Sequence, residues 1–143
     1  GSHFDFDLSL AVEQSNDNPV FYVQYAHARI CSILRLLAED GLCAAAYADT
    51  DTSLLDAPQE TALLKRLAAF PGEIASAAES MEPSRITRYV MEVAADFHSF
   101  YNACRIRGEE ENLAKARLKL CEATRTVIAN CLEILGVTAS EKM

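Results

Sequence analysis

Helical periodicity is the feature of this sequence that most limits its possible folds. From residue 19 onward, apolar side chains recur every three or four positions, whereas the strict alternation typical of β-strands is scarce. The four prolines fall at the edges of the periodic segments, as expected for residues that interrupt helices. The pattern therefore predicts an all-α fold, a helical bundle of about five helices.

Start and stop signals set the expected bounds of these helices. Asn18-Pro19 combines a capping side chain with a proline suited to the first helical position. The expected helices run from Pro19 to a stop at Gly41, from about Gln59 to Ala69, from about Gly72 to Ser80, from Pro83-Ser84 to Gly108 and from Glu109 to Gly136. We expect a short helical extension after Gly41 and then a loop up to residue 58, and a break between helices at Phe70-Pro71.

The chain length of 143 residues suits one domain that buries its own core. No apolar run is long enough to span a bilayer, and no basic-then-apolar signal segment opens the chain. Residues 1–3, Gly-Ser-His, look like the remnant of a cleaved tag, and the chain is therefore expected to be a fragment of a larger protein.

The five cysteines form no CxxC pair, their number is odd, and each lies in an apolar or helical stretch. This pattern favours buried free thiols over a disulfide or zinc framework. Free thiols indicate a reducing compartment, so a cytoplasmic location is expected.

The net charge of −8 is unevenly distributed. Residues 1–84 hold 4 basic and 13 acidic side chains, net −9, and residues 85–143 hold 9 basic and 8 acidic ones, net +1. An acidic chain disfavours indiscriminate nucleic-acid binding, but screening over about 10 Å still allows a local basic patch to meet phosphates.

The motifs of a self-contained enzyme are missing from the sequence. There is no glycine-rich phosphate loop, no HExxH and no Cys/His cluster with metal spacing. Outside the tag, His27 and His98 are the only imidazoles, and neither has a neighbouring Ser or Cys that suggests a catalytic elbow. No catalytic residue, metal or cofactor is expected within these residues.

Two helix edges combine aromatic and basic side chains. Tyr22, Tyr25 and Arg29 stand at i, i+3 and i+7 beside the apolar face of the first long helix. His27 falls on the apolar side, which favours a partly buried histidine with a satisfied hydrogen bond over a ligand or base.

The helix that follows Ser84 repeats this arrangement. Four residues stand at i, i+3, i+4 and i+7 along its border: His98, Tyr101, Asn102 and Arg105. Rings that stack on unpaired bases and cations that follow phosphates are what single-stranded RNA binding requires. Spacing alone leaves two interpretations open, because amphipathic rim packing gives the same pattern.

Several stretches resemble arginyl-tRNA synthetases. "NPVFYVQYAHARICSIL" resembles the stretch that opens the C-terminal anticodon-binding domain of that family, and residues 4–17 resemble its link from the catalytic domain. "FHSFYNACRI", "ARLKLCEATRTVIANCLEILGV" and the closing "TASEKM" are similar to later segments. The resemblance covers residues 4–143, with residues 18–143 as the anticodon-binding helical domain.

The resemblance implies a helical domain of the DALR type that binds the anticodon loop of tRNA-Arg. In the full-length enzyme, a catalytic domain absent from this chain would use ATP to attach arginine to tRNA-Arg. The fragment is expected to bind tRNA and to catalyse nothing alone. Its expected partners are tRNA-Arg and the enzyme's own catalytic domain, with no membrane and no DNA.

Family positions that face the anticodon loop match Tyr22, Tyr25, Arg29, Tyr101 and the terminal Met143. Two departures stand out. Arg105 occupies a position where some relatives carry a ring, so stacking there would use the guanidinium. Ser140 replaces the usual proline of the tail, which predicts a more mobile Met143.

Three basic residues of the last helix, Lys115, Arg117 and Lys119, are open to two interpretations, phosphate contacts or a solvated helix face.

Two alternatives to the anticodon-binding function also remain. One is a helical protein-interaction domain with no RNA role, whose acidic half docks a basic partner. The other is a related synthetase with the same domain type, such as the cysteinyl enzyme.

Overall fold

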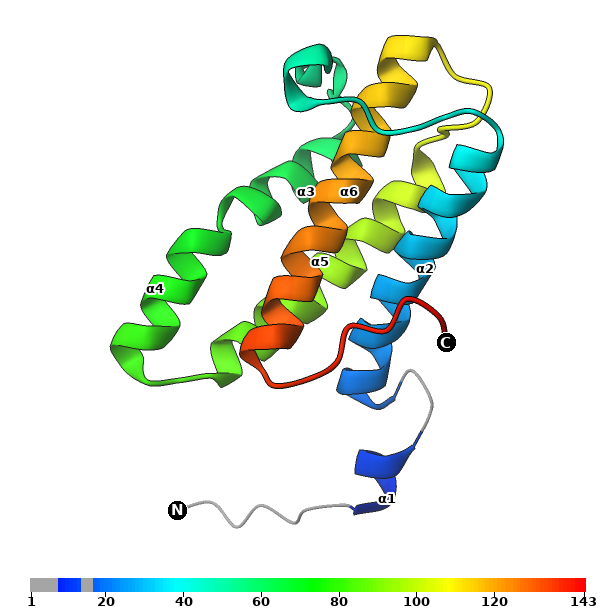
Figure 1. Cartoon of the computed structure of the whole chain (residues 1–143). Coiled ribbons are helices and arrows are strands. Elements are labelled where there is room, and N and C mark those ends of the chain that lie inside the picture. The colour runs from blue at the N-terminus through cyan, green and yellow to red at the C-terminus, as the bar shows by residue number, and fades with distance from the viewer. Residues whose placement is uncertain (1–7, 14–16) are drawn as a thin grey trace.

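The computed structural model describes residues 8–13 and 17–143 of the chain, and its main body is a bundle of five α-helices (Figure 1). These helices are α2 (Pro19–Glu39), α3 (Pro58–Ala68), α4 (Phe70–Ser80), α5 (Ser84–Ala103) and α6 (Glu111–Ile134). Helix α5 contacts each of the other four, and α3 and α4 lie on the side of α5 and α6 away from α2 (Figure 1). No strand occurs among the described residues, so the predicted all-α bundle is confirmed.

A shorter helix, α1 (Leu8–Val12), precedes the bundle and falls within the predicted linker. The predicted tag remnant and the rest of the predicted linker, residues 4–7 and 14–16, lie outside the described residues, and the proposed boundary at residue 18 stays a prediction. Among residues 8–13 and 17–143, no helix is both long and apolar enough to cross a membrane.

Helix α2 begins and ends where its local signals predict. The Asn18 side chain accepts a hydrogen bond from the Val20 amide at 3.0 Å, and Pro19 occupies the first helical position. At the other end Gly41 adopts a φ of +80°, a left-handed conformation that glycine tolerates at helix ends. The Leu42 amide then bonds back to the Leu37 carbonyl at 2.9 Å.

The predicted helical extension after Gly41 is wrong. The chain instead runs without helix to residue 46 and then makes two short 3₁₀ turns, η1 (Tyr47–Asp49) and η2 (Thr52–Leu54). The left-handed turn at Gly41 redirects the chain, and Leu42 and Ala44 then pack against the core. Tertiary packing therefore overrides the helix propensity of the small-residue run.

The junction between α3 and α4 is tighter than predicted. Helix α4 begins at Phe70 rather than near Gly72, and only Ala69 separates it from α3. Pro71 fits the first turn of α4 because its missing N–H would have no helical acceptor there. Phe70 stacks on Tyr89 of α5 with ring centroids 6.0 Å apart, which fixes the start of α4 against the bundle.

The core is centred between α2, α5 and α6, with Leu63 of α3 and Ala77 of α4 added to it, and is lined by large apolar side chains. Phe97, Phe100, Ile30 and Ile128 are fully buried. The predicted buried thiols are confirmed at three positions, Cys104, Cys121 and Cys131, and burial raises the pKa of the Cys121 thiol to about 12. Cys31 is only half-buried and Cys43 is exposed, so the prediction is wrong for Cys43 because the chain after Gly41 is not helical.

A buried ion pair joins α3 to α6. Arg117 Nε donates to Glu60 Oε1 at 2.6 Å, and Glu60 is fully buried. The other carboxylate oxygen of Glu60 accepts from the Ala57 amide at 2.9 Å. Arg117 Nη1 also donates to the Arg105 carbonyl and lies 3.3 Å from Glu109.

Both sequence-based interpretations of Arg117 are therefore wrong, since its side chain faces neither phosphate nor solvent. Its flanking lysines are partly exposed and pair with carboxylates. Lys115 Nζ lies 2.6 Å from Glu111, and Lys119 pairs with Glu122.

We predict that Glu60→Ala lowers the free energy of unfolding by about 3–5 kcal/mol, because it leaves the buried Arg117 guanidinium with only the partly exposed Glu109 carboxylate as a counter-charge. Urea unfolding followed by circular dichroism measures this loss. The control variant Glu111→Ala removes the carboxylate of an exposed pair and should lose far less. Equal losses in the two variants would show that the buried pair has no special role.

Candidate functional site

Contact between α2 and α5 brings four of the predicted site residues into one cluster. The Tyr22 and His98 rings meet edge to face with centroids 5.8 Å apart. Arg29 Nη1 lies 3.1 Å from His98 Nδ1, and the Arg29 guanidinium carbon lies 5.6 Å from the centre of the Tyr101 ring. Parts of the two aromatic-basic edges predicted separately therefore meet in one cluster, with Arg29 at its centre.

The electrostatics of this cluster keep His98 neutral. Burial, reinforced by the nearby Arg29 charge, lowers the pKa of His98 below its ordinary value. Since the Arg29 guanidinium can only donate, the neutral His98 accepts through Nδ1 and carries its proton on Nε2. A neutral His98 thus orients Arg29 without cancelling its positive charge.

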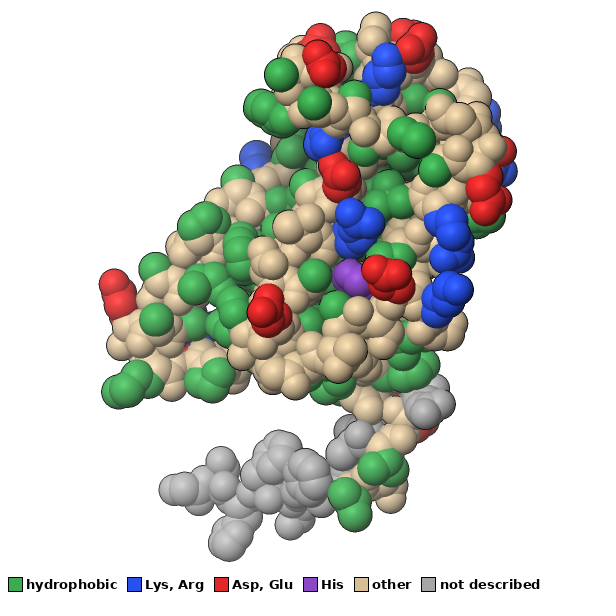
Figure 2. Space-filling view, viewed as in Figure 1, with side chains coloured by type: hydrophobic (Ala, Val, Ile, Leu, Met, Phe, Trp, Pro, Cys, Tyr) green, Lys and Arg blue, Asp and Glu red, His purple; other side chains and the backbone are tan. Residues whose placement is uncertain are grey.

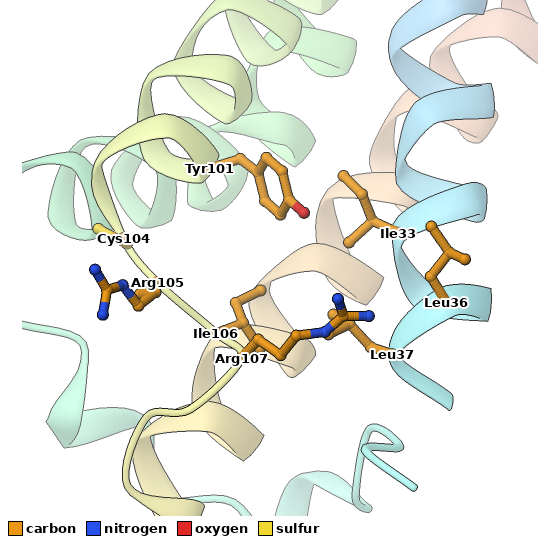
Figure 3. A pocket seen from close by; sticks show the side chains of 8 residues that line it. All are labelled: Ile33, Leu36, Leu37, Tyr101, Cys104, Arg105, Ile106 and Arg107. Carbon is orange, nitrogen blue, oxygen red and sulfur yellow. The ribbon is translucent and has the colours of Figure 1, made fainter. Parts of the chain in front are cut away.

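Tyr101 is anchored from the core. Its ring stacks on buried Phe97 with centroids 6.0 Å apart and an interplanar angle of 18°. Its hydroxyl is directed toward Ile33 of α2 (Figure 3). This packing holds the tyrosine in one orientation, which suits a residue that has to meet a ligand in a fixed geometry.

Tyr25 lies apart from that cluster, in a pocket of about 420 Å³ beside the C-terminus of the chain. The pocket also contains Arg29, and it brings Tyr25, 40% exposed, near the terminal Met143. Two further cations line it, Arg35 and Lys142. Figure 2 shows basic side chains along the α2 side of the molecule.

Sequence reasoning missed Arg35 and Lys142. Arg35 follows Arg29 by six residues, which turns it about 120° away around the helix, so the spacing that linked Tyr22, Tyr25 and Arg29 gave no signal for it. No local pattern could have placed Lys142, because its position depends on how the tail folds back.

Two side chains of α2 hold the C-terminal tail. Gln24 Nε2 donates to the Thr138 carbonyl at 2.8 Å, and His27 Nδ1 lies 2.8 Å from the Ser140 carbonyl oxygen. His27 is buried, so its predicted satisfied, core-side position is confirmed. Because the tail residue contributes its carbonyl, serine at position 140 supplies the same acceptor as proline would. The predicted mobility of Met143 is untested.

The remaining two candidates do not join the cluster. Asn102 is exposed on α5, and Arg105 follows the end of that helix. Figure 3 shows the Arg105 side chain directed away from the Tyr101 ring, so this conformation shows no stacking between them. Within the described parts of the chain, no group of three or more potential ligands could hold a metal ion.

We predict that the pKa of His98 in the folded protein lies below 6.5, measured by following its ring resonances in an NMR pH titration. In Arg29→Gln the pKa should rise but stay below the ordinary value, since burial is the larger cause. A His98 pKa at or above 6.5 would contradict the proposed neutral acceptor.

The same shift sets the direction of a stability change with pH. His98 binds its proton more readily in the unfolded state than in the folded state. Its contribution to the free energy of unfolding is therefore fully present above pH 6.5 and is lost as pH falls through the lower folded pKa. Wild type should therefore lose more stability than His98→Gln between pH 7 and pH 5 in urea unfolding. Parallel losses in the two proteins would contradict this expectation.

Comparison with known proteins identifies the family of the chain. Residues 23–143 match the model of the DALR anticodon binding domain. The chain is 57% identical over 143 residues to arginine–tRNA ligases of Ruminiclostridium cellulolyticum and Acetivibrio thermocellus, covering all of this chain and 25% of each relative. Its structure resembles Thermus thermophilus arginyl-tRNA synthetase with a TM-score of 0.79 and 32% identity, covering 97% of this chain and 23% of that one.

The chain therefore spans about a quarter of the length of the curated relatives it matches. The family match covers all five bundle helices apart from the first turn of α2, and it includes both aromatic-basic edges except Tyr22. The chain belongs to the DALR anticodon binding domain family.

Proposed function

We propose that this chain binds the anticodon loop of tRNA-Arg as the anticodon-binding domain of an arginine–tRNA ligase. The observation that carries the proposal is the α2–α5 cluster, where Arg29 lies between His98 and the ring of Tyr101. A guanidinium held beside rings on a partly exposed surface suits unpaired bases and their phosphates. The arginine-specific names of the matched relatives support the choice of tRNA.

The proposed interface has two parts joined by Arg29. Tyr22, His98 and Tyr101 form the part between α2 and α5, and Tyr25 and Met143 form the part beside the C-terminus. Asn102 and Arg105 extend the first part beyond the end of α5. Arg35 and Lys142 add cations to the second part.

In the full-length protein we propose that a catalytic domain activates arginine with ATP and transfers it to tRNA-Arg, in the cytoplasm. This chain would then contribute tRNA affinity and position, with no catalytic residue or cofactor of its own. The alternative of a protein-interaction domain without an RNA role has no observation in its favour. A cysteinyl enzyme also lacks support, since the relatives described above are arginine–tRNA ligases.

We expect this chain to bind an anticodon stem-loop of tRNA-Arg with a strong dependence on salt. If Z phosphates are contacted, log K should fall with log salt with a slope of about −0.7Z to −0.9Z. Fluorescence anisotropy from low to physiological salt measures both affinity and slope. Absence of binding at low salt, or equal binding of an unrelated stem-loop, would overturn the proposal.

We further expect Tyr25→Ala to weaken stem-loop binding by about 1–3 kcal/mol, the contribution of one stacked base. Tyr25 is 40% exposed, so its removal should leave the fold intact. Tyr47→Ala is the matched control, because Tyr47 is an exposed tyrosine on η1, outside the proposed interface. Equal binding by the two variants would remove Tyr25 from the interface.

The full-length enzyme provides a test of Tyr101. Tyr101→Ala should lose on the order of 1–3 kcal/mol of tRNA binding while arginine activation stays normal. Equal loss of activation would indicate that Tyr101 has a structural role only. Its stacking on Phe97 is the contact through which such a role would act.

A further inference from the structure

A pocket of about 270 Å³ lies where the C-terminal half of α2 faces the segment that joins α5 to α6 (Figure 3). This volume is slightly below the range of about 300–1,000 Å³ typical of sites for drug-sized ligands, so it suits one small planar group. Its lining combines an apolar floor with one phenol and two arginines, of which Arg105 turns its guanidinium away from Tyr101 (Figure 3): Ile33, Leu36, Leu37, Cys104 and Ile106, with Tyr101, Arg105 and Arg107. Leu36 is 50% exposed in this lining.

In the segment that joins α5 to α6, buried and exposed residues alternate over residues 104–107, so both arginines are exposed. Cys104 leaves α5 in an extended conformation, with φ −112° and ψ 111°. Cys104 and Ile106 are buried, whereas Arg105 and Arg107 are exposed. The Arg105 carbonyl is held from below by the buried Arg117, so the backbone that presents both cations is fixed.

Tyr101 offers its hydroxyl to this pocket. Its ring is already engaged by Phe97 and by the Arg29 guanidinium, and its oxygen is directed toward Ile33 (Figure 3). A hydroxyl beside an apolar floor can bond the polar edge of a base whose faces rest on aliphatic side chains.

Arg107 is held in an exchangeable pair. Its guanidinium extends across the pocket toward Leu37 (Figure 3) and lies 2.5 Å from the Asp40 carboxylate, just beyond the end of α2. The side chains are 64% and 45% exposed, and an ion pair in so much water is weak. A phosphate oxygen can therefore replace the carboxylate at little cost.

We infer that this pocket receives one unpaired nucleotide of the bound RNA, and that Arg107 exchanges Asp40 for the phosphate of that nucleotide. The base rests on Leu36 and Ile33 beside the Tyr101 hydroxyl. Asp40 acts as a competitor that holds Arg107 across the pocket until RNA arrives. This inference rests on the proposed function and adds Leu36, Arg107 and Asp40 to it.

Three variants test the exchange with the tRNA-Arg anticodon stem-loop as the probe. Arg107→Gln should weaken binding about two- to five-fold at low salt and make the salt slope less steep by about 0.7–0.9, since one phosphate contact is lost. Asp40→Asn should strengthen binding by a similar factor, because it removes the competitor. The double variant should bind like Arg107→Gln, since Asp40 acts only through Arg107.

Two control variants each remove one charge, positive or negative, at a position outside the pocket. Arg88→Gln alters an exposed arginine in the first half of α5, and Glu79→Gln alters an exposed acid on α4. Neither should change the salt slope as much as Arg107→Gln. Thermal unfolding confirms that each variant is folded, and the gain expected from Asp40→Asn cannot arise from misfolding.

The outcomes separate this inference from the proposed function. Wild-type protein that binds no stem-loop overturns the anticodon-binding proposal itself. Wild-type binding that neither Arg107→Gln nor Asp40→Asn alters beyond the controls overturns only the exchange. Weaker binding by Asp40→Asn also overturns it, because Asp40 would then support the RNA-bound state instead of competing with it.

Discussion

The buried ion pair between Glu60 and Arg117 is the interaction on which the rest of this domain depends. One guanidinium reaches the α3 carboxylate and the Arg105 carbonyl, and it lies beside Glu109 at the start of the last long helix. Because charges buried without partners are costly, these groups have to be arranged together. The pair thereby fixes where α3 meets α6. It also fixes the path of the segment that follows α5, and this segment forms one wall of the inferred nucleotide pocket.

Helix α2 serves both the core and the proposed interface. Its period of 3.6 residues buries Val23, Ala26 and Ile30 while Tyr22 and Arg29 face α5. Packing on α5 turns these edge residues into a cluster with His98 and Tyr101. The neutral His98 accepts a hydrogen bond from Arg29 and adds no negative charge beside it, so the guanidinium keeps a positive charge that an anionic ligand can meet.

The C-terminal tail completes the proposed interface from the opposite end of the sequence. Gln24 and His27 bind successive parts of its backbone, and this contact places Met143 beside Tyr25. A buried histidine that pattern analysis assigned to the core therefore also positions a residue of the proposed RNA site. His27 fills both roles because its ring is buried in the core while its Nδ1 lies within hydrogen-bond distance of the Ser140 carbonyl oxygen.

The sequence by itself determined what depends on local chemistry: the all-α class, the start of α2 at Asn18-Pro19, its end at Gly41, and the two aromatic-basic edges. These features follow from capping, glycine conformation and periodicity, which act over a few residues. Only the tertiary structure decided that Arg117 is buried against Glu60 and that the chain after Gly41 is not helical. It alone also joined the two edges through Arg29 and paired Arg107 with Asp40. The physical reason is that burial and ion pairing depend on partners dozens of residues away, and no local pattern specifies which partners the packed bundle brings together.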